Sequence, residues 1–135
     1  MAAGHDIYAL KDGPLPAQRQ MLVDTGIAIG RPRGTYGRLE AGSGMASQHG
    51  IAVGGGFIDA DYTGEINVIL WNHGKTSYKF KAADCMAQLI VENIQTHDAI
   101  EIDNQEDRER GTGGFGSSDI GPKRVIACEE PNVNM

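Results

Sequence analysis

Cysteine is scarce in this sequence, which has only two in 135 residues, Cys85 and Cys128. Two cysteines are too few for the disulfide framework of a small secreted domain, so that class is excluded. Neither cysteine has a histidine or a second cysteine at the spacing of a metal site, and the four histidines are scattered singly. We therefore expect both cysteines to be free thiols in a reducing compartment, and the protein to be cytoplasmic or nuclear.

Long apolar runs and an excess of basic residues are also missing. No stretch approaches the length that crosses a membrane, and the first residues lack the basic start and hydrophobic stretch of a signal peptide. The 12 basic residues are outnumbered by 18 acidic ones, whereas proteins that clamp a nucleic-acid backbone need a positive surface. We expect neither a membrane nor a nucleic acid as partner. With 40% hydrophobic residues, the chain is long enough for one domain with a core.

The chain does carry the pattern of β-strands. Apolar residues recur with a period of two over residues 21–29 and 66–71, as in strands with one buried face. Further strand-like segments follow at 77–80 and 86–94, and glycine-containing turn signals separate the segments. We predict an all-β fold, a sandwich or jelly-roll-like barrel of short strands, with at most one short helix around residues 43–49.

Residues 54–64 contain three consecutive glycines followed closely by Asp59, Asp61 and Tyr62. Glycine lets a backbone turn sharply and approach a ligand closely, at an entropic cost that a packed strand has no reason to bear. We interpret the segment as a small-molecule site, in which Asp59 can act as a general base and Tyr62 offers a flat surface to a sugar or a base. The alternative is a β-hairpin whose aspartates hydrogen-bond their own backbone, with Tyr62 as a partly buried turn residue.

A second glycine-rich run, residues 110–118, holds the guanidinium of Arg110, the ring of Phe115 and two hydroxyl groups. The run cannot form a helix or a core strand, and such runs often serve as flexible linkers. A linker, however, has no need of an aromatic residue. We therefore interpret the run as a flap that grips phosphate through Arg110 and covers a base with Phe115.

Together these segments resemble the homotrimeric dUTP pyrophosphatases (dUTPases), a family that splits dUTP into dUMP and pyrophosphate. The similarity extends from residue 2 to residue 118. Five family motifs occur in the family's order, at residues 3–7, 36–46, 56–64, 83–90 and 110–118. The third and the fifth are the closest matches. Five motifs in order make a chance resemblance improbable.

The resemblance implies a division of the chain and an assembly. Residues 1–109 would form the β-barrel domain, and residues 110–118 a flexible glycine-rich C-terminal arm. Residues 119–135, where the strand pattern stops, would be a mobile tail. The assembly would be a homotrimer with three sites at subunit interfaces, each closed by an arm.

For catalysis, the resemblance implies hydrolysis between the α- and β-phosphates with Mg²⁺ as cofactor. Asp59 would activate the water that attacks the α-phosphorus in line. Ser43 and the Gly44 amide would donate to α- and β-phosphate oxygens, and Gln88 to the β-phosphate. Mg²⁺ that bridges triphosphate oxygens needs few protein ligands, so we expect no direct one, with Asp6 in contact through water.

Substrate choice would depend on shape. In the family, the hairpin before the catalytic aspartate reads uracil through its backbone, so Gly56 and Ile58 would form a pocket too tight for the methyl group of thymine. Tyr62 would pack on the deoxyribose and exclude a 2′-hydroxyl. In the arm, Arg110 would clamp the γ-phosphate and Phe115 would cover the base. Gly116 and Ser117 would add two further substrate contacts.

Two departures from the family pattern leave a second class of function open. Gly42 stands where the family has an arginine before the phosphate-binding serine, and the loss of one charge-assisted contact costs about 1.5–3 kcal/mol. Arg31 or Arg33 could supply the charge instead. Family members usually also carry a strand before the first motif, whereas this sequence starts almost directly at that motif. The alternative is thus a catalytically weakened, retroelement-derived or domesticated copy that acts as a nucleotide-binding or protein-interaction module. A dCTP deaminase, which shares the fold, fits less well.

Overall fold

The computed structural model describes residues 1–106, 108, 111–114 and 125–128. The chain divides into two compact units, Met1–Ile94 and Gln95–Met135, which we describe separately. In the described part of the chain, no helix is long and apolar enough to cross a membrane. The first unit contains every predicted site residue up to Gln88.

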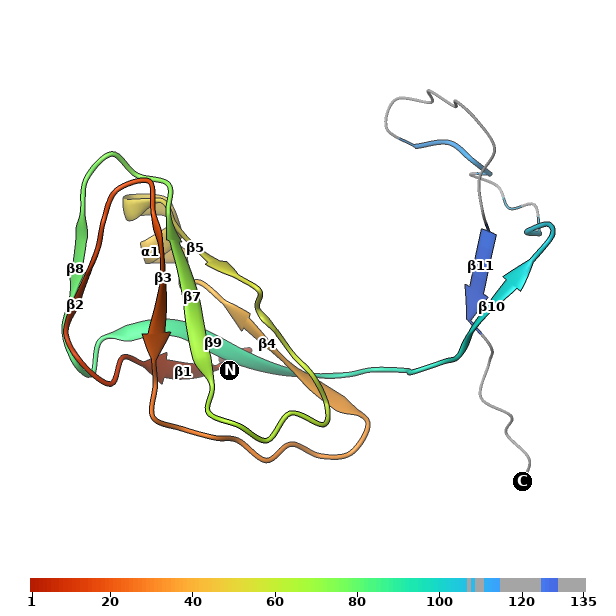
Figure 1. The fold of residues 1–135 in the computed structure, drawn as a ribbon, viewed down its shortest axis with the longest axis horizontal. Coiled ribbons are helices and arrows are strands. Elements are labelled where there is room, and N and C mark those ends of the chain that lie inside the picture. The colour runs from red at the N-terminus through yellow and green to blue at the C-terminus, as the bar shows by residue number, and fades with distance from the viewer. Residues whose placement is uncertain (107, 109–110, 115–124, 129–135) are drawn as a thin grey trace. The chain divides into compact units, whose positions relative to one another are not determined.

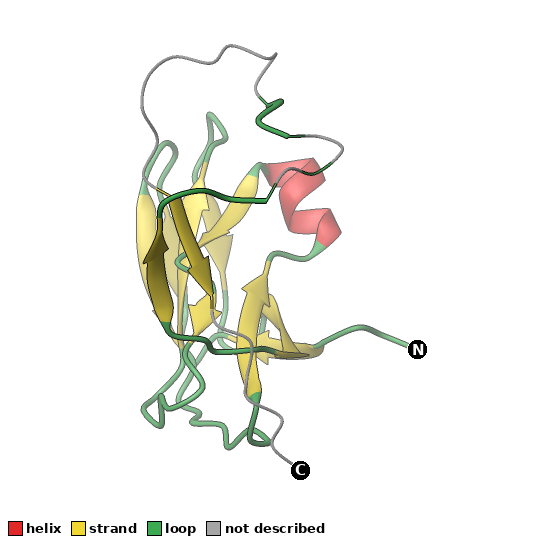
Figure 2. Cartoon of the chain, turned by 90° about the vertical axis from the view of Figure 1, so that its right-hand side faces the viewer, coloured by secondary structure: helices red, strands yellow, loops and turns green. Residues whose placement is uncertain are grey.

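The first unit consists of antiparallel sheets (Figures 1 and 2). The largest has the order β1-β9-β4-β6, with bounds His5–Tyr8, Cys85–Asn93, Thr35–Glu40 and Phe57–Ile58. A second has the order β3-β7-β5, with bounds Gln20–Asp24, Asn67–Asn72 and Ile51–Gly54. The third pairs β2, Gly13–Leu15, with β8, Tyr78–Phe80. Among the described residues the one helix is α1, Ser43–His49, between β4 and β5. The predicted all-β class and the short helix are both confirmed.

Alternation along the strands separates the buried from the outward-facing side chains. In β7, Val68 and Leu70 are fully buried and their neighbours are not, as the period of two predicts. The strand predicted over residues 21–29 is shorter in the structure and ends at Asp24. Gly26 adopts a φ of 71°, a left-handed conformation that interrupts regular strand geometry.

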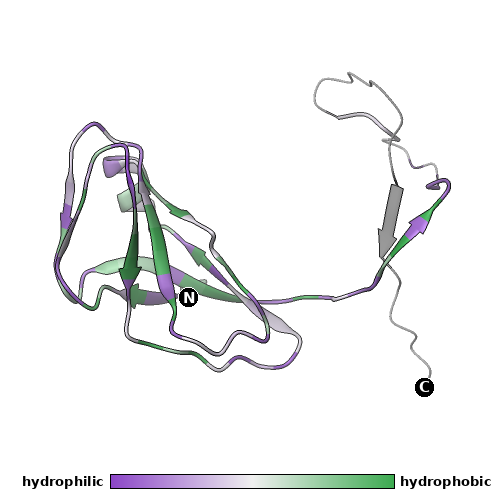
Figure 3. Cartoon of the chain, in the orientation of Figure 1, coloured by the Kyte–Doolittle hydropathy of each residue, from purple (hydrophilic) through white to green (hydrophobic). Residues whose placement is uncertain are grey.

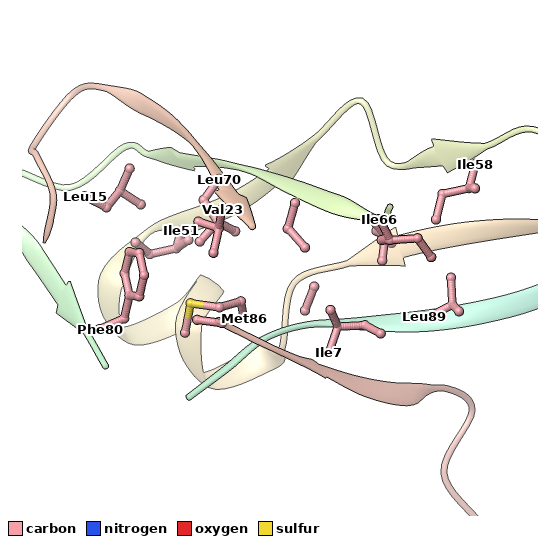
Figure 4. Close-up of a cluster of buried hydrophobic side chains, with 14 residues drawn as sticks. Ile7, Leu15, Val23, Ile51, Ile58, Ile66, Leu70, Phe80, Met86 and Leu89 are labelled. Atoms are coloured by element: carbon pink, nitrogen blue, oxygen red, sulfur yellow. The ribbon is translucent and has the colours of Figure 1, made fainter. Parts of the chain in front are cut away.

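The core lies where the inward faces of the three sheets meet (Figure 4). Its fully buried apolar side chains come from β2, β5, β7 and β9, and the largest are Leu15, Ile51, Leu70, Met86 and Leu89. Figure 3 shows strongly hydrophobic stretches along β3 and β7. Burial of one such side chain stabilises the fold by about 1.5–3 kcal/mol. Ile58 belongs to the same cluster at 8% exposure, so the core anchors β6, the short strand that precedes Asp59.

One buried polar side chain, Asn72 at the end of β7, joins the end of β2 to the loop between β7 and β8. Its Nδ2 atom donates to the carbonyl oxygens of Leu15 at 3.1 Å and Thr76 at 2.9 Å. Its Oδ1 atom accepts a hydrogen bond from the Gly74 amide at 2.8 Å. At 1% exposure, the amide of Asn72 is thus paired on both its donor and its acceptor side.

In the second unit, β10 (Ala99–Ile102) pairs antiparallel with β11 (Val125–Cys128). The register joins Ala99 to Cys128 and Ile102 to Val125. Of the predicted arm, only residues 111–114 are described. Four predicted site residues therefore lie outside the described part of the chain: Arg110, Phe115, Gly116 and Ser117.

Candidate active site

The candidate site begins at β6, where glycine is sterically required before the strand. The Leu39 amide donates to the carbonyl oxygen of Gly56 at 2.7 Å, which brings the two backbones together. A Cβ atom at residue 56 would collide with the carbonyl oxygen of Leu39. Ile58 then turns its side chain into the core, while Phe57 points outward at 71% exposure. The backbone of this hairpin is therefore held in place from the inner side, as a backbone-reading pocket requires.

After β6 the chain makes a turn that presents Asp59. The Tyr62 amide donates to the carbonyl oxygen of Asp59 at 3.1 Å and closes the turn. Asp59 and Asp61 are both exposed, and no hydrogen bond or ion pair from a described residue engages either carboxylate. The alternative of a hairpin stabilised by its own aspartates is therefore wrong for this conformation. The Asp59 carboxylate is available to a water or a ligand.

Tyr62 is fixed at the far end of the turn. Its hydroxyl donates to the carbonyl oxygen of Glu65 at 2.7 Å. A Cβ atom at Gly64 would lie 2.6 Å from that hydroxyl oxygen, so glycine leaves the ring its space. The Glu65 carboxylate in turn accepts a hydrogen bond from the Gly26 amide at 2.9 Å. Sequence reasoning missed Glu65, because its partner lies 39 residues away and no local pattern indicates the contact.

A hollow of about 190 Å³ lies beside this turn. Ile58, Asp59 and Tyr62 line it, together with Ile66 and Leu39. The hollow combines an apolar floor, an aromatic ring at 46% exposure and one free carboxylate. Such a mixture suits a small ligand with one flat apolar part and one polar reacting part.

The residues predicted to contact phosphate lie elsewhere on the chain. Ser43 and Gly44 form the exposed first turn of α1, after Gly42. Gln88 on β9 is paired with Asp6 on β1 and with Glu40 on β4.

Directly paired residues in adjacent strands place their side chains on the same face, so an amide stands between two exposed carboxylates there. Asp6 accepts a hydrogen bond of 3.5 Å from the Tyr8 hydroxyl.

Strand order separates Asp6 and Gln88 from the Asp59 hairpin. Asp6 lies on β1 and Ile58 on β6, which are the opposite edges of the four-stranded sheet. Three strand spacings separate the edges, about 14 Å in total. The hollow beside Asp59 includes none of Ser43, Gly44 and Gln88. Within one chain, the structure brings Gly56, Ile58, Asp59 and Tyr62 together and leaves the phosphate residues in a second group.

The family model for dUTPase matches residues 1–119 of this chain. The chain belongs to the dUTPase family. It is 47% identical over 118 residues to the deoxyuridine 5′-triphosphate nucleotidohydrolase of Candida glabrata, covering 87% of this chain and 82% of that protein. Identity to the Candida albicans protein of the same name is 48% over 120 residues, covering 87% and 76%. Among solved structures, the dUTPase of Staphylococcus bacteriophage 80alpha with dUPNHPP superposes with a TM-score of 0.80 at 26% identity, covering 89% and 88%.

Besides Glu65, Arg31 also makes contacts with the Asp59 turn that the sequence motifs did not indicate. From the sequence, Arg31 is a candidate substitute cation for phosphate. In the structure, its guanidinium donates to the backbone carbonyl oxygens of Ile29, Asp59 and Tyr62. Each terminal nitrogen therefore has at least one backbone partner, next to the predicted catalytic turn.

Two side chains near the candidate site have perturbed pKa values. A hydrogen bond of 2.6 Å to Glu92 raises the pKa of the Tyr36 phenol, which also stacks on Phe57 with ring centroids 5.6 Å apart. Burial, followed by the charge of Asp6, raises the pKa of the Cys85 thiol. Both groups therefore stay protonated near neutral pH, and Cys85 offers no thiolate nucleophile.

Proposed function

We propose that this dUTPase-family chain hydrolyses dUTP to dUMP and pyrophosphate. The relatives reported above are named for hydrolysis of this nucleotide. The main structural support is the Asp59 carboxylate. It is exposed, forms no hydrogen bond or ion pair with a described residue, and lines a hollow together with Ile58 and Tyr62. A base that has no protein partner is ready to accept a proton from water.

In the proposed reaction, Asp59 accepts a proton from a water molecule as that water attacks the α-phosphorus. The new bond joins the water oxygen to the α-phosphorus, and the bond to the oxygen bridging to the β-phosphate breaks. Pyrophosphate leaves with the electron pair of that bond. Asp59 then releases the proton to solvent. Positioning of the water and stabilisation of the phosphoryl oxygens account for most of the catalysis.

Recognition of the nucleoside is assigned to the same hairpin. The side chain of Ile58 is buried in the core, so this residue offers its backbone groups to a base. Gly56 cannot carry a side chain without colliding with Leu39, which keeps the backbone edge uncovered. Tyr62, held by Glu65, would pack on the deoxyribose and reject a 2′-hydroxyl through lack of space.

The triphosphate is assigned to the second group of residues. The hydroxyl of Ser43, the amide of Gly44 and the side-chain amide of Gln88 would donate to the α- and β-phosphate oxygens. Arg110 would clamp the γ-phosphate from the arm. Phe115 would cover the base, and Gly116 and Ser117 would add further arm contacts.

Mg²⁺ is the proposed cofactor, and the donor set is compatible with it. Asp6 is an exposed carboxylate next to Gln88 in the sheet, and its hydrogen bond from the Tyr8 hydroxyl is long, at 3.5 Å. Such a carboxylate can hold a water of the cation's shell without binding the cation directly. When bound, Mg²⁺ would neutralise part of the charge on the triphosphate oxygens.

The separation of the two groups supports a shared site in a homotrimer. In one chain, Gln88 on β9 lies two strand spacings from β6 and Asp6 on β1 lies three, about 10 and 14 Å, and neither Ser43 nor Gly44 lines the hollow beside Asp59. Neighbouring copies would bring the hairpin of one subunit against the phosphate residues of another, and an arm would close the site. Residues 1–109, 110–118 and 119–135 are the proposed barrel, arm and tail.

A second candidate function rests on Gly42. The chain lacks the family's arginine at that point, and Glu40 places a negative charge two residues away. Weaker phosphate binding would leave a protein that holds a nucleotide without turning it over quickly. Its role would then be that of a nucleotide-binding or protein-interaction module.

Pyrophosphate release distinguishes the two candidates. Purified protein with Mg²⁺ is incubated with dUTP, dTTP, dCTP or UTP, beside an Asp59→Asn control that preserves the shape of the side chain. Release confined to dUTP and absent from Asp59→Asn is the expected result. Binding of dUTP by calorimetry with no release would favour the module, and full release by Asp59→Asn would remove Asp59 from its role.

A further inference from the structure

Arg31 lies in the loop before β4, yet its guanidinium group reaches the turn that carries Asp59. Its Nη2 atom donates to the backbone carbonyl oxygen of Asp59 at 2.5 Å and to that of Tyr62 at 3.0 Å. Its Nη1 atom donates to the carbonyl oxygen of Ile29 at 3.2 Å, in the same loop as Arg31 itself. One side chain thus joins both ends of the turn to the loop.

The turn has few other attachments. Residues 59–62 are all exposed, so burial of their side chains contributes little to holding them. The hydrogen bond from the Tyr62 amide to Asp59 closes the turn without connecting it to the rest of the molecule. The bond from the Tyr62 hydroxyl reaches Glu65, three residues along, and connects to the loop at Gly26 only through the Glu65 carboxylate.

The chemistry of the guanidinium suits this role. A cationic donor forms hydrogen bonds roughly twice as strong as a neutral one, and its planar shape fixes the directions of its N–H groups. The Nε atom of Arg31 is buried and has no partner among the described residues, so this end of the guanidinium is shielded from solvent. Three of the five N–H groups of the guanidinium thus donate to backbone carbonyl oxygens, which directs the side chain at the turn.

We propose that Arg31 is a positioning residue for Asp59. By binding the carbonyl oxygens at the two ends of the turn, it limits the positions from which the Asp59 carboxylate can reach the attacking water. Arg31 itself touches neither the nucleotide nor the water. The inference rests on the proposed function, in which Asp59 is the base.

Kinetics on two variants tests the proposal. Arg31→Ala removes the clamp, and Arg31→Lys keeps a cation with one donor nitrogen. For Arg31→Ala we expect kcat with dUTP to fall about 10 to 100-fold, because a misplacement of about 1 Å costs rate of this order. Affinity for dUMP should fall much less than kcat, by about 3-fold, because Gly56 and Ile58 precede the turn and Tyr62 alone of the nucleoside contacts lies in it. This split between kcat and affinity separates positioning from substrate binding. Arg31→Lys should lie between Arg31→Ala and the unmodified protein.

Chemical rescue adds a readout that a general loss of stability would not produce. Guanidinium chloride at millimolar concentration should restore part of kcat in Arg31→Ala, compared with the same concentration of sodium chloride. It should not restore kcat in Asp59→Asn. Arg19→Ala is the matched control, because it removes an exposed arginine outside the turn and should leave kcat unchanged.

Amide hydrogen exchange tests the clamp without any reaction. In Arg31→Ala, exchange at residues 59–65 should become faster while exchange in β7 stays the same. An unmodified protein that fails to hydrolyse dUTP would refute the proposed function, and the exchange data would still decide whether Arg31 holds the turn. Unchanged kcat in Arg31→Ala would overturn the positioning role. Equal losses of kcat, dUMP affinity and thermal stability would overturn it as well.

Discussion

Gly42→Arg changes a residue whose surroundings have room for a long side chain. Gly42 precedes α1 with φ of -63° and ψ of 145°, an extended conformation that any residue adopts. No atom lies within 4 Å of a Cβ atom placed there. The substitution therefore adds a guanidinium next to Ser43 and Gly44 without displacing the backbone.

The size of the effect follows from competition for the new cation. A charge-assisted contact with a phosphate oxygen is worth about 1.5–3 kcal/mol, which corresponds to roughly 10 to 150-fold in kcat/KM. Glu40 is exposed and would compete for the guanidinium, but an exposed ion pair gives only about 0–1 kcal/mol. Because Ser43 and Gly44 are exposed to water, we expect the lower end, about 10-fold.

Stability should move in the opposite direction. Glycine is a better residue than arginine at the start of a helix, and a cation there opposes the helix dipole, so the free energy of unfolding should fall by about 1 kcal/mol. The assay is pyrophosphate release at several dUTP concentrations, with urea unfolding on the same samples. Gly42→Gln, which has no charge, is the control and should gain no activity. Equal activity of Gly42→Arg and the unmodified protein would refute the reasoning, and would mean that this loop does not face the phosphates.

Three further predictions follow from particular contacts. Gly56→Ala should lower dUTP turnover at least 100-fold and destabilise the fold by about 1–3 kcal/mol, because the Cβ atom of the new alanine would collide with Leu39. Gly30→Ala is the control, since open space surrounds that position, and it should change neither turnover nor stability. Asn72→Ala should reduce the free energy of unfolding by about 2–4 kcal/mol in urea titrations, since it removes the bonds to the Thr76 carbonyl and the Gly74 amide and leaves the Leu15 carbonyl only a long hydrogen bond of 3.5 Å from the Ser77 hydroxyl, and a loss below about 1 kcal/mol would contradict this account. Light scattering should give about three times the 14.4 kDa mass of one chain, and a monomeric mass would contradict the shared site.

Sequence patterns predicted the elements of the fold well where the evidence was local. A period of two identified β7, because alternation depends only on which side chains face the core. The helix expected around residues 43–49 is α1, Ser43–His49. The glycine-rich run before Asp59 was rightly expected to be a turn with little side-chain bulk. Such features depend on residues within a few positions of each other, so a single sequence contains them.

The length of β3 could not be predicted in the same way. Apolar alternation continues to residue 29, but pairing with β7 stops at Asp24. Alternation shows which face a residue takes and says nothing of where its partner strand ends. The conformation of Gly26 and the departure of the chain towards Arg31 decide that end.

By itself, the sequence determined the class of fold, the family and the types of side chain available for chemistry, because these depend on local order and composition. Only the tertiary structure decided which of those side chains meet. Strand pairing placed Gln88 between Asp6 and Glu40, and put two strand spacings between Gln88 and β6, the strand before Asp59. The sequence suggested Arg31 as a phosphate ligand, whereas in the folded chain its guanidinium donates to the backbone of a turn 28 residues away. Contacts between distant segments are set by packing and register, which no local pattern records.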